Sequence, residues 1–504
     1  MTNVEDNVLP VDPGSAASEH DDAHVLDERP RRGERSSRQK AVRHFTPAER
    51  GARGKAARGE LPRSAHADWQ PGPSRRDPIE LLEEQAQTRL PELGPIRYGR
   101  MLVSPFTFFR GGAYLMAADL ADGPRTGLHA QLCGDAHLSN FGVFAAPDRR
   151  LVFSINDFDE TLPGPFEWDV KRFAASFAVA GRELGFDEAS RRSVVMTAVR
   201  EYRKAIARFA DMRNIDVWYT RLDVTGFVEQ LGAATSRKQM KRFQTNVAKA
   251  RTKDSLRALT KLCRIVDGEL RIVGDPPLVM PIEDVAPGVE KEQLEDVVRR
   301  MIRTYRRTLP HDRRNLLESY RYVHAARKVV GVGSVGARAW ILLMVGRDNN
   351  DPLFLQFKEA QASVLEPFLG RSQYAQHGQR VVEGQRMMQA TADIMLGWER
   401  IVAIDGQLKD FYIRQLWDAK GSAEVETMDQ SALEAYGRIC GWTLARAHAR
   451  SGDRIAIAAY LGKSDSFDRA MASFAEIYAD QNDRDYRALQ EAVASGRVTA
   501  EMGV

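Results

Sequence analysis

The feature that most constrains this chain is a polar loop, a short apolar strand and an acidic turn in close succession. The loop reads Gly134-Asp135-Ala136-His137-Leu138-Ser139-Asn140-Phe141, the run Leu151–Ile155 follows, and Asn156-Asp157-Phe158-Asp159 comes directly after it. A short apolar run bounded by polar segments is typical of a buried strand. Carboxylate and amide oxygens at its ends suit Mg²⁺, which prefers hard oxygen ligands. The segment therefore predicts a polar site built around one strand.

The spacing of these residues resembles the phosphoryl-transfer site of protein kinases. There an Asp, an Asn five residues later and an Asp at the end of the next strand read H-R-D-x-x-x-x-N and D-F-G. The resemblance implies that Asp135 accepts the proton of an attacking hydroxyl. It implies that Asn140 and Asp157 bind magnesium on the nucleotide phosphates, with Asp159 assisting. The alternative for Asp157 and Asp159 is a polar turn held by side-chain-to-backbone hydrogen bonds.

A second segment lies about two hundred residues downstream and predicts a small antiparallel sheet. A strand ending near Lys328 leads into Gly331-Val332-Gly333-Ser334-Val335-Gly336, and two further apolar runs follow, the second ending at Lys358. Glycines let the backbone approach phosphates closely, because they carry no Cβ. By resemblance to a kinase amino-terminal lobe, we expect Gly331, Gly333, Ser334, Gly336 and Lys358 to hold the phosphates of ATP. Glu383 is the expected partner of Lys358 on the following helix, and Glu366 is a weaker candidate.

Kinases place this lobe before the catalytic loop, so the order here is reversed. Coincidence and circular permutation both explain the reversal. Residues 432–450 show the apolar spacing of an amphipathic helix and end in Leu444-Ala445-Arg446-Ala447-His448. In small-molecule kinases a helix with such an ending precedes the catalytic loop. This detail favours permutation and predicts that the helix packs beside the Asp135 loop without being joined to it.

Two other sites compete for the same residues. Gly331-x-Gly333-x-x-Gly336 matches the dinucleotide fingerprint, but that fold needs a helix after the last glycine. The residues before the turn at Gly346 are too few and too bulky, which favours a hairpin. Gly-Asp-x-His at His137 could belong to a binuclear phosphatase, but the later histidine segment which that chemistry needs is missing. A structural role for His137 is favoured.

Composition leaves most soluble classes open. The 504 residues are 43% hydrophobic and 28% charged, as in an ordinary globular protein. Three scattered cysteines indicate a reducing compartment and no structural zinc. With no long apolar run and no apolar core at the amino terminus, neither a membrane partner nor a secretory signal is expected, and a cytoplasmic location is predicted. The net charge of +4 says little about partners. The basic stretch of the amino-terminal tail could touch nucleic acid, but a solvated tail is favoured, so no nucleic-acid partner is expected.

The chain divides into four predicted parts. Residues 1–75 are expected to be a disordered acidic and basic tail, with a short helix near 46–57. Residues 76–320 are predicted to form a helical lobe, with one helix over 104–120 and the catalytic and metal-binding segment at 130–160. Residues 321–425 are predicted to form a β-rich nucleotide-binding lobe, which also holds a helix over 379–395 and two strands within 398–415. Helices in 426–504 complete the helical lobe.

Three runs resemble a bacterial domain-of-unknown-function family, number 2252. They are Ser104–Gly111, Cys133–Gly142 and Ile155–Thr161, and a fourth run, Phe411–Ser422, resembles another segment of the family. The resemblance covers roughly 46–490 and implies no activity. A weaker similarity is to aminoglycoside and choline phosphotransferases, whose loop reads H-G-D-x-H-x-x-N. This chain departs from them at Cys133, where they have His.

Together these observations predict an α+β fold, a circularly permuted protein-kinase-like arrangement of two lobes. The expected activity is ATP- and Mg²⁺-dependent phosphoryl transfer to a hydroxyl of an unknown small-molecule or protein acceptor. Three alternatives stay open: a kinase-like nucleotide-binding protein without turnover, an adenylyl transferase, and an NAD(P)-binding enzyme.

Overall fold

A computed structural model describes residues 44–503. Its gaps are residues 225–240, 242–244, 246, 253, 267, 286–287, 330, 334, 403–405 and 417–418. By its internal contacts the chain forms two units, residues 1–44 and residues 45–504. All elements described below belong to the second unit. Residues 1–43, most of the predicted tail, lie outside the described residues.

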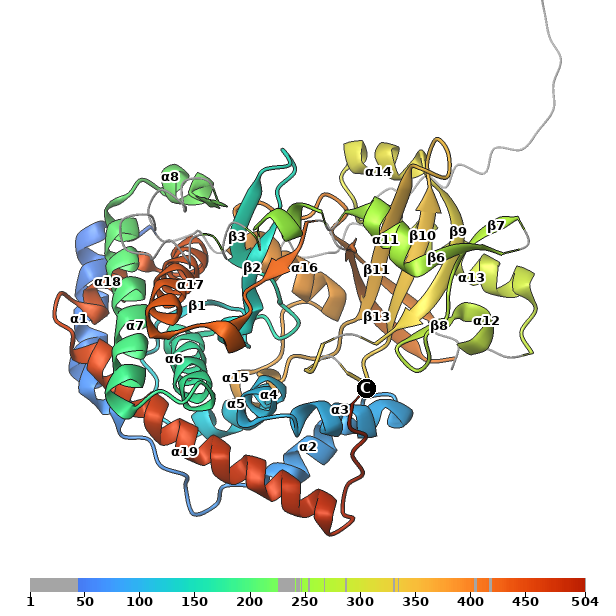
Figure 1. Cartoon of the computed structure of the whole chain (residues 1–504). Coiled ribbons are helices and arrows are strands. Elements are labelled where there is room, and N and C mark those ends of the chain that lie inside the picture. The colour runs from blue at the N-terminus through green and yellow to red at the C-terminus, as the bar shows by residue number, and fades with distance from the viewer. Residues whose placement is uncertain are drawn as a thin grey trace, which may run out of the picture. The chain divides into compact units, whose positions relative to one another are not determined.

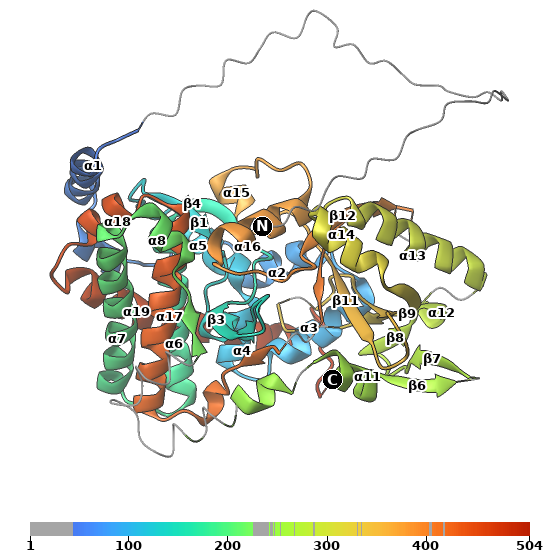
Figure 2. The same cartoon turned by 90° about the horizontal axis from the view of Figure 1, so that it is seen from above.

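Four long helices pack side by side and carry much of the largest core (Figures 1 and 2). They are α6 (Phe166–Glu183), α7 (Glu188–Asp211), α17 (Gln430–Ser451) and α19 (Ser466–Ala494). Residues at helical spacing on α17, such as Leu433, Tyr436 and Leu444, are buried as predicted. Gly441 lets α17 approach α7 closely, because a Cβ there would lie 2.3 Å from the Ala198 carbonyl oxygen.

The amino-terminal helices are folded from residue 46 onward, which shortens the predicted tail. Helix α1 (Pro47–Glu60) starts with a capping box between Thr46 and Glu49 and packs on α18 (Arg454–Leu461). The 3₁₀ turn η1 (Arg63–Ala67) packs on α19. Small apolar residues such as Gly54 and Ala57 suffice here, because the partner helix supplies the rest of the core.

Short helices follow before the polar loop. They are α2 (Pro78–Ala86), the 3₁₀ turn η2 (Pro91–Leu93), α3 (Gly94–Met101), α4 (Pro105–Gly111) and α5 (Ala113–Ala121). A single helix over 104–120 was predicted, but the structure has two. The break falls at Gly112, which ends α4 and starts α5.

Two small sheets bring the polar loop and the acidic turn together. The first pairs β1 (His129–Leu132) with β4 (Leu162–Pro165). The second has the order β14-β2-β3-β5. Its strands are β2 (Phe141–Ala145), β3 (Leu151–Ile155), β5 (Leu222–Asp223) and β14 (Gly421–Ser422). The 3₁₀ turn η3 (Leu138–Asn140) leads into β2. The strand predicted over 151–155 is confirmed.

A six-stranded antiparallel sheet, in yellow and orange in Figure 1, has the order β12-β13-β11-β10-β9-β8. Its strands are β8 (Val279–Pro281), β9 (Arg321–Lys328), β10 (Ala339–Val345), β11 (Pro352–Glu359), β12 (Gly397–Val402) and β13 (Leu408–Gln415). The strands predicted on both sides of the glycine loop and at 398–415 are therefore present. The glycine loop joins two antiparallel strands, so it is no strand–helix dinucleotide motif.

Residues from about 255 to 320 pack on this sheet, although they were predicted to belong to the helical lobe. Apolar residues of α13 cover one face, and α11 lies against the other. The reason is the one-sided apolar pattern of α13, where Leu294, Val298 and Met301 meet Leu342 and Phe357. The elements of this segment are α11 (Ser255–Leu262), β6 (Cys263–Val266), β7 (Glu269–Ile272), α12 (Ile282–Val285), α13 (Lys291–Arg306) and α14 (His311–Glu318). The short helix α8 (Asn214–Tyr219) precedes them and contacts α17.

Helix α16 (His377–Met388) connects β11 to β12 and touches β13, β1 and α17. It ends earlier than the predicted helix over 379–395. The remaining short elements are α15 (Glu366–Leu369) and η4 (Val425–Thr427). The described part of the chain is thus α+β, with a region of long packed helices and antiparallel sheets that carry further helices on their faces. None of its helices is long and apolar enough to cross a bilayer.

Candidate active site

The acidic turn is fixed by backbone contacts on both sides. Its first residue, Asn156, donates its backbone N–H to the Asn140 carbonyl at 2.8 Å, which brings the end of the polar loop to the turn. The Asp159 backbone N–H donates to Asp157 Oδ1 at 3.1 Å, and the Phe158 ring is buried. An aspartate bonding its own backbone two residues on is a stable turn device. The structure therefore brings Asn140, Asp157 and Asp159 into one small region.

Lys358 meets this turn from the sheet. Its strand, β11, lies between β10 and β13, and the Lys358 side chain is 2% exposed. The ammonium forms an ion pair with Asp159, 199 residues away in sequence. The Tyr412 hydroxyl donates to the other Asp159 oxygen at 2.8 Å. Burial opposes ionisation of Asp159, but the Lys358 ammonium holds the pKa of that carboxyl below its usual range.

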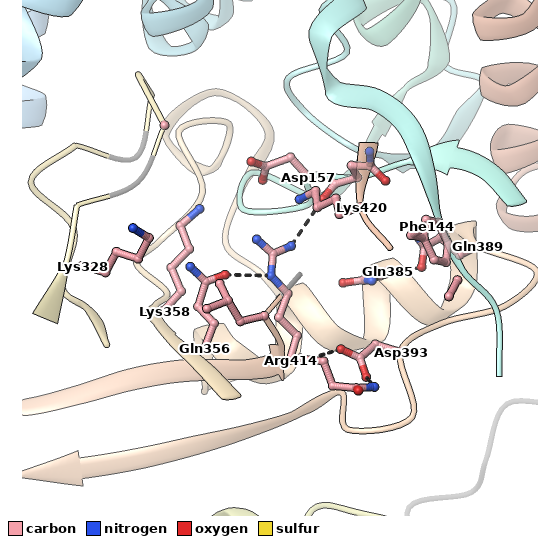
Figure 3. A pocket seen from close by; sticks show the side chains of 15 residues that line it. Phe144, Asp157, Lys328, Gln356, Lys358, Gln385, Gln389, Asp393, Arg414 and Lys420 are labelled. Atoms are coloured by element: carbon pink, nitrogen blue, oxygen red, sulfur yellow. Dashed lines mark hydrogen bonds between the residues drawn. The ribbon is translucent and has the colours of Figure 1, made fainter. Parts of the chain in front are cut away.

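A cavity of about 280 Å³ opens between the turn and the sheet. Asp157 and Lys358 line it, together with Arg414 of β13 and Lys420 (Figure 3). These four side chains point toward one another in the close-up. The remaining lining residues are Phe144, Ala145, Asn156, Lys328, Gly331, Gln356, Gln385, Gln389, Asp393, Gln415 and Leu416.

The side chains that line this cavity carry more positive than negative charge. Two carboxylates, Asp157 and Asp393, line it, against Lys328, Lys358, Arg414 and Lys420. Burial, helped by the neighbouring carboxylate of Asp159, raises the pKa of Asp157. The Arg414 charge and burial lower the pKa of Lys420 to about 7. Crowded cations of this kind attract an anion, which would relieve their mutual repulsion.

Arg414 is held ready at the cavity wall. Its Nε donates to Gln356 Oε1 at 3.0 Å, and Nη1 donates to the Asn156 carbonyl at 3.4 Å (Figure 3). Sequence analysis did not single out Arg414 or Lys420. A signal existed for Arg414, because Tyr412 and Arg414 are two apart in a strand and so share a face. For Lys420, which precedes a two-residue strand, nothing in the sequence pointed to the cavity.

Asp135 lies on the helical side of the turn and is held by α6. Arg172 places Nε and Nη2 at 2.8 and 2.7 Å from Asp135 Oδ1, and Nη2 also donates to the Phe109 carbonyl. The other oxygen, Oδ2, is 3.6 Å from His137 Nε2. Burial raises the pKa of Asp135, and Arg172 opposes the rise. Burial also holds the pKa of His137 well below its usual range, so this ring is neutral.

Helix α17 packs behind the Asp135 loop, as predicted. Its His448 Nε2 lies 3.2 Å from Asp169 Oδ2 on α6, and Nδ1 bonds the Tyr202 hydroxyl at 2.8 Å. Asp169 in turn accepts the backbone N–H groups of Cys133 and Gly134 at 2.8 and 3.0 Å. Two helices that are distant in sequence therefore fix the backbone that leads to Asp135. The Asn140 amide nitrogen donates to the Asp135 carbonyl at 2.8 Å and holds the loop from its other end.

The predicted glycine loop reaches the cavity only in part. Gly331 lines it, whereas Gly333 lines a different cavity that Asp159 also borders. Gly336 adopts a positive φ of 91° and abuts Arg89. Ser334, predicted to contact phosphate, lies outside the described residues. The loop is tied to the helical side, because Leu90 N–H donates to the Gly336 carbonyl at 2.8 Å.

The expected pair between Lys358 and Glu383 is wrong. Glu383 pairs with Arg386 on its own helix at 3.2 Å, and Glu366 lies 3.9 Å from Arg380. Helix α16 approaches the turn through Gly384, where a Cβ would lie 2.4 Å from the Thr161 side chain. Glu383 is 31% exposed, and the Asp159 carboxylate takes its place beside Lys358.

Arg380 of α16 is a further residue that the sequence did not reveal. Its side chain is 1% exposed and donates to three carbonyls, those of Thr161, Asp159 and Gln361, at 2.7–2.8 Å. The guanidinium joins the acidic turn to the segment after β11. It therefore positions both members of the Lys358–Asp159 pair.

The described residues hold no group of three or more His, Cys, Asp or Glu side chains arranged to bind a metal. All three cysteines are free and buried, in agreement with the expectation that they form no disulfide framework.

Comparison with other proteins identifies the family of the chain. No curated protein and no solved structure matches it. A family model described as "Uncharacterized protein conserved in bacteria (DUF2252)" matches residues 89–492, which include the polar loop, the acidic turn and all six strands of the large sheet. The chain therefore belongs to the DUF2252 family.

Proposed function

We propose that this protein is an ATP- and Mg²⁺-dependent phosphotransferase that acts on a hydroxyl of a small-molecule or protein acceptor. The observation that carries the proposal is the ion pair of Lys358 with Asp159 at the edge of a cation-lined cavity. A lysine for phosphates and a carboxylate for magnesium are the two charges that nucleotide phosphoryl transfer needs side by side.

The ion pair is also the expected state of such a site without nucleotide. A buried ammonium such as that of Lys358 needs an opposite charge beside it, and Asp159, 24% exposed, supplies that charge when no ligand does so. Nucleotide phosphates would take over Lys358, and the metal would take over Asp159. Mg–ATP would thus replace the Lys358–Asp159 contact with two new contacts, one to each side chain.

The residues present fit this ligand. Lys358, Arg414 and Lys420 would contact phosphate oxygens, and Gly331 would allow the backbone to approach. Mg²⁺ in nucleotide sites uses one or two carboxylates and completes its shell with phosphates and water, so a cluster of three protein ligands is not required. Asp157, Asp159 and the Asn140 amide oxygen would hold it. The ion supplies neutralisation of phosphate charge.

Asp135 would act as the base for the acceptor hydroxyl. Both Arg172 contacts go to Oδ1, so Oδ2 is the oxygen that would accept the proton. The raised pKa of this buried carboxyl increases its affinity for a proton over that of an exposed aspartate. Catalysis would otherwise rest on positioning and charge stabilisation.

The arrangement of elements supports a permuted order of the two halves of the site. The helix α17, which carries His448, packs behind the Asp135 loop although it follows that loop by some three hundred residues. The sheet with its glycine loop and lysine meets the acidic turn, which precedes it in sequence. This likeness to kinases is an analogy of arrangement, and the activity is argued from the side chains.

The first test is a thermal-shift titration with ATP, with and without Mg²⁺. Saturation at a hundred times Kd stabilises a protein by about 2.7 kcal/mol, which is a measurable rise in Tm. Lys358→Met and Asp157→Asn should lose the shift, whereas Lys463→Met, an exposed residue after α18, should keep it. A full shift in Lys358→Met, or stabilisation by NAD(P)H in place of ATP, would contradict the proposal.

The second test separates transfer from binding. The protein is incubated with fractions of a bacterial lysate and ATP labelled at the γ- or the α-phosphate. Label from the γ-position in a product supports phosphoryl transfer, and label from the α-position indicates adenylyl transfer instead. Asp135→Asn should bind ATP normally and transfer at least about a hundredfold more slowly, the usual contribution of a general base. A variant with unchanged transfer would remove Asp135 from the mechanism.

A further inference from the structure

The large sheet has a second cavity on the face opposite Lys358. In strand register, Lys358 lies opposite Ala339 and Tyr412, and Gln356 lies opposite Ile341 and Arg414. Neighbours directly across a sheet share a face, and successive residues alternate between faces. Phe357 and Glu359, with their neighbours Trp340 and Phe411, therefore lie on the other face.

This second cavity has a volume of about 300 Å³ and mostly apolar walls. The sheet contributes Ala325, Trp340, Leu342, Ile401 and Phe411, and helices α12 and α13 close the opposite side. The helix residues and the remaining lining residues are Leu90, Glu92, Ile282, Val285, Val297, Val298, Met301, Arg327 and Arg338. An apolar pocket of at least 300 Å³ with a few converging polar groups is the usual form of a small-molecule site.

The polar groups of the cavity are two guanidinium groups and one carboxylate. Arg327 donates Nη1 to Glu92 at 2.9 Å, and Glu92 is itself 53% exposed. The Arg327 Nε is buried and has no hydrogen-bond partner among the described residues. Arg338 also lines the cavity, and its Nη1 lies 3.4 Å from Glu359 Oε2. The Arg327 Nη2 donates to Met280 Sδ at 3.0 Å. A guanidinium carries five N–H donors, so the Arg327 group that lines the cavity can bind a ligand oxygen as well as Glu92.

We propose that this cavity binds a small amphipathic carboxylate, with its apolar body between the sheet and α13 and its carboxylate on Arg327. The volume would hold about ten water molecules at roughly 30 Å³ each in the liquid, which is room for a short-chain carboxylate. A guanidinium fork matches a planar carboxylate, and the pairing is charge-assisted. A neutral ligand would gain no charge-assisted bond from Arg327. This site does not depend on the proposed transferase activity, because no residue of the first cavity lines it.

The test uses octanoate as the probe on the full chain, followed by calorimetry and by the change in Tm. Octan-1-ol is the matched ligand without the charge. We expect octanoate to bind saturably and to raise Tm, and octan-1-ol to bind at least about tenfold more weakly. Arg327→Gln should weaken octanoate about tenfold or more, whereas Arg347→Gln, on the exposed turn after β10, should not. Such a loss is the size expected for one charged hydrogen-bond partner.

A filling variant tests the place of the ligand. Ile401→Trp adds a large ring from the cavity wall, and Val402→Trp adds the same ring at the next residue of β12, which is 61% exposed. Octanoate binding should be lost in the first variant and kept in the second, with urea unfolding showing that both are folded. No octanoate binding at millimolar concentration, equal binding of octan-1-ol, or unchanged binding in Ile401→Trp would each overturn the proposal. The ATP–Mg²⁺ thermal shift should be the same in both variants, so a failure here leaves the proposed function untouched.

Discussion

The two carboxylates Asp135 and Asp159 are satisfied by different parts of the chain. Asp135 pairs with Arg172 of α6, which lies 37 residues further along the chain and within the helical region. Asp159 pairs with Lys358 of the large sheet, 199 residues away. The first contact joins two segments of the helical region, and the second joins the acidic turn to the large sheet. Asp135 thus belongs to the scaffold of the helical region, whereas Asp159 belongs to the junction between the turn and the sheet, where the proposed ligand would replace one of the partners.

The largest effect should come from breaking the scaffold of the helical region. Arg172→Met leaves the Asp135 carboxylate buried without its charge partner and removes the bond to the Phe109 carbonyl. Removing one partner of a buried ion pair costs about 3–5 kcal/mol. Urea unfolding should show this loss, and the double variant Arg172→Met/Asp135→Asn should recover part of it. A loss under about 1 kcal/mol would mean that Arg172 does not hold Asp135.

Breaking the junction should cost less. Lys358→Met should lower the free energy of unfolding by about 1–3 kcal/mol, because Asp159 keeps its bond from Tyr412 and is partly solvated. The pKa of Asp159 is depressed in the folded state, so its stabilisation is present above its unfolded pKa and is lost as the pH falls through the folded pKa. The gap between wild type and variant, measured by urea unfolding, should be full at pH 7 and shrink below about pH 4. A difference in unfolding free energy that does not depend on pH would show that Lys358 does not stabilise the protein through Asp159.

Lys420 allows a test of whether an anion binds at the junction, because its charge changes near neutral pH. Its pKa of about 7 means that it is protonated at pH 6 and mostly neutral at pH 8. Binding of ATP without metal, followed by calorimetry, should therefore weaken roughly three- to tenfold more between pH 6 and pH 8 in the wild type than in Lys420→Arg. Arginine keeps its charge across this range, so it corrects for titration of the phosphates themselves. Identical pH profiles would place Lys420 away from the anion.

The smallest effect should come from Glu160, next to the junction. Burial raises the pKa of this carboxyl to about 7 in the folded state. The folded protein then holds an extra proton between about pH 4.5 and pH 7, so stability falls as the pH rises through that range and is level above it. Glu160→Gln cannot ionise, so its Tm relative to wild type should increase by about 1–3 °C from pH 5 to pH 8. A Tm difference that is constant with pH would show that Glu160 is ionised throughout.

Local patterns predicted the elements around the site well. The strand over 151–155 and the helix α17 that carries His448 follow from apolar spacing, which depends only on neighbouring residues. Residues 255–320 were misassigned, because an amphipathic helix such as α13 shows which face it buries and not what it buries that face against. The division of Pro105–Ala121 into two helices was also missed, because Gly112 alone does not reveal a change of direction.

The residues of the site divide in the same way. Asp157, Asp159 and Lys358 were found because each ends a strand, and the structure brings all three together. Arg414 was missed, because a strand residue becomes a site residue only through the face that the sheet presents. Lys420 precedes β14, and nothing in its own segment pointed to the cavity. Glu383 was chosen from its helix alone, and in the structure it pairs with Arg386 of that helix.

The amino-acid order by itself determined the turn and strand chemistry: an aspartate that bonds its own backbone, a lysine at a strand end, and helices with one apolar side. These are short-range effects, set by residues within a few positions of one another. Only the tertiary structure decided that Lys358 neutralises Asp159 and that a second cavity lies behind the same strand. Those outcomes depend on which apolar faces bury each other across some two hundred residues, and no local pattern encodes that choice.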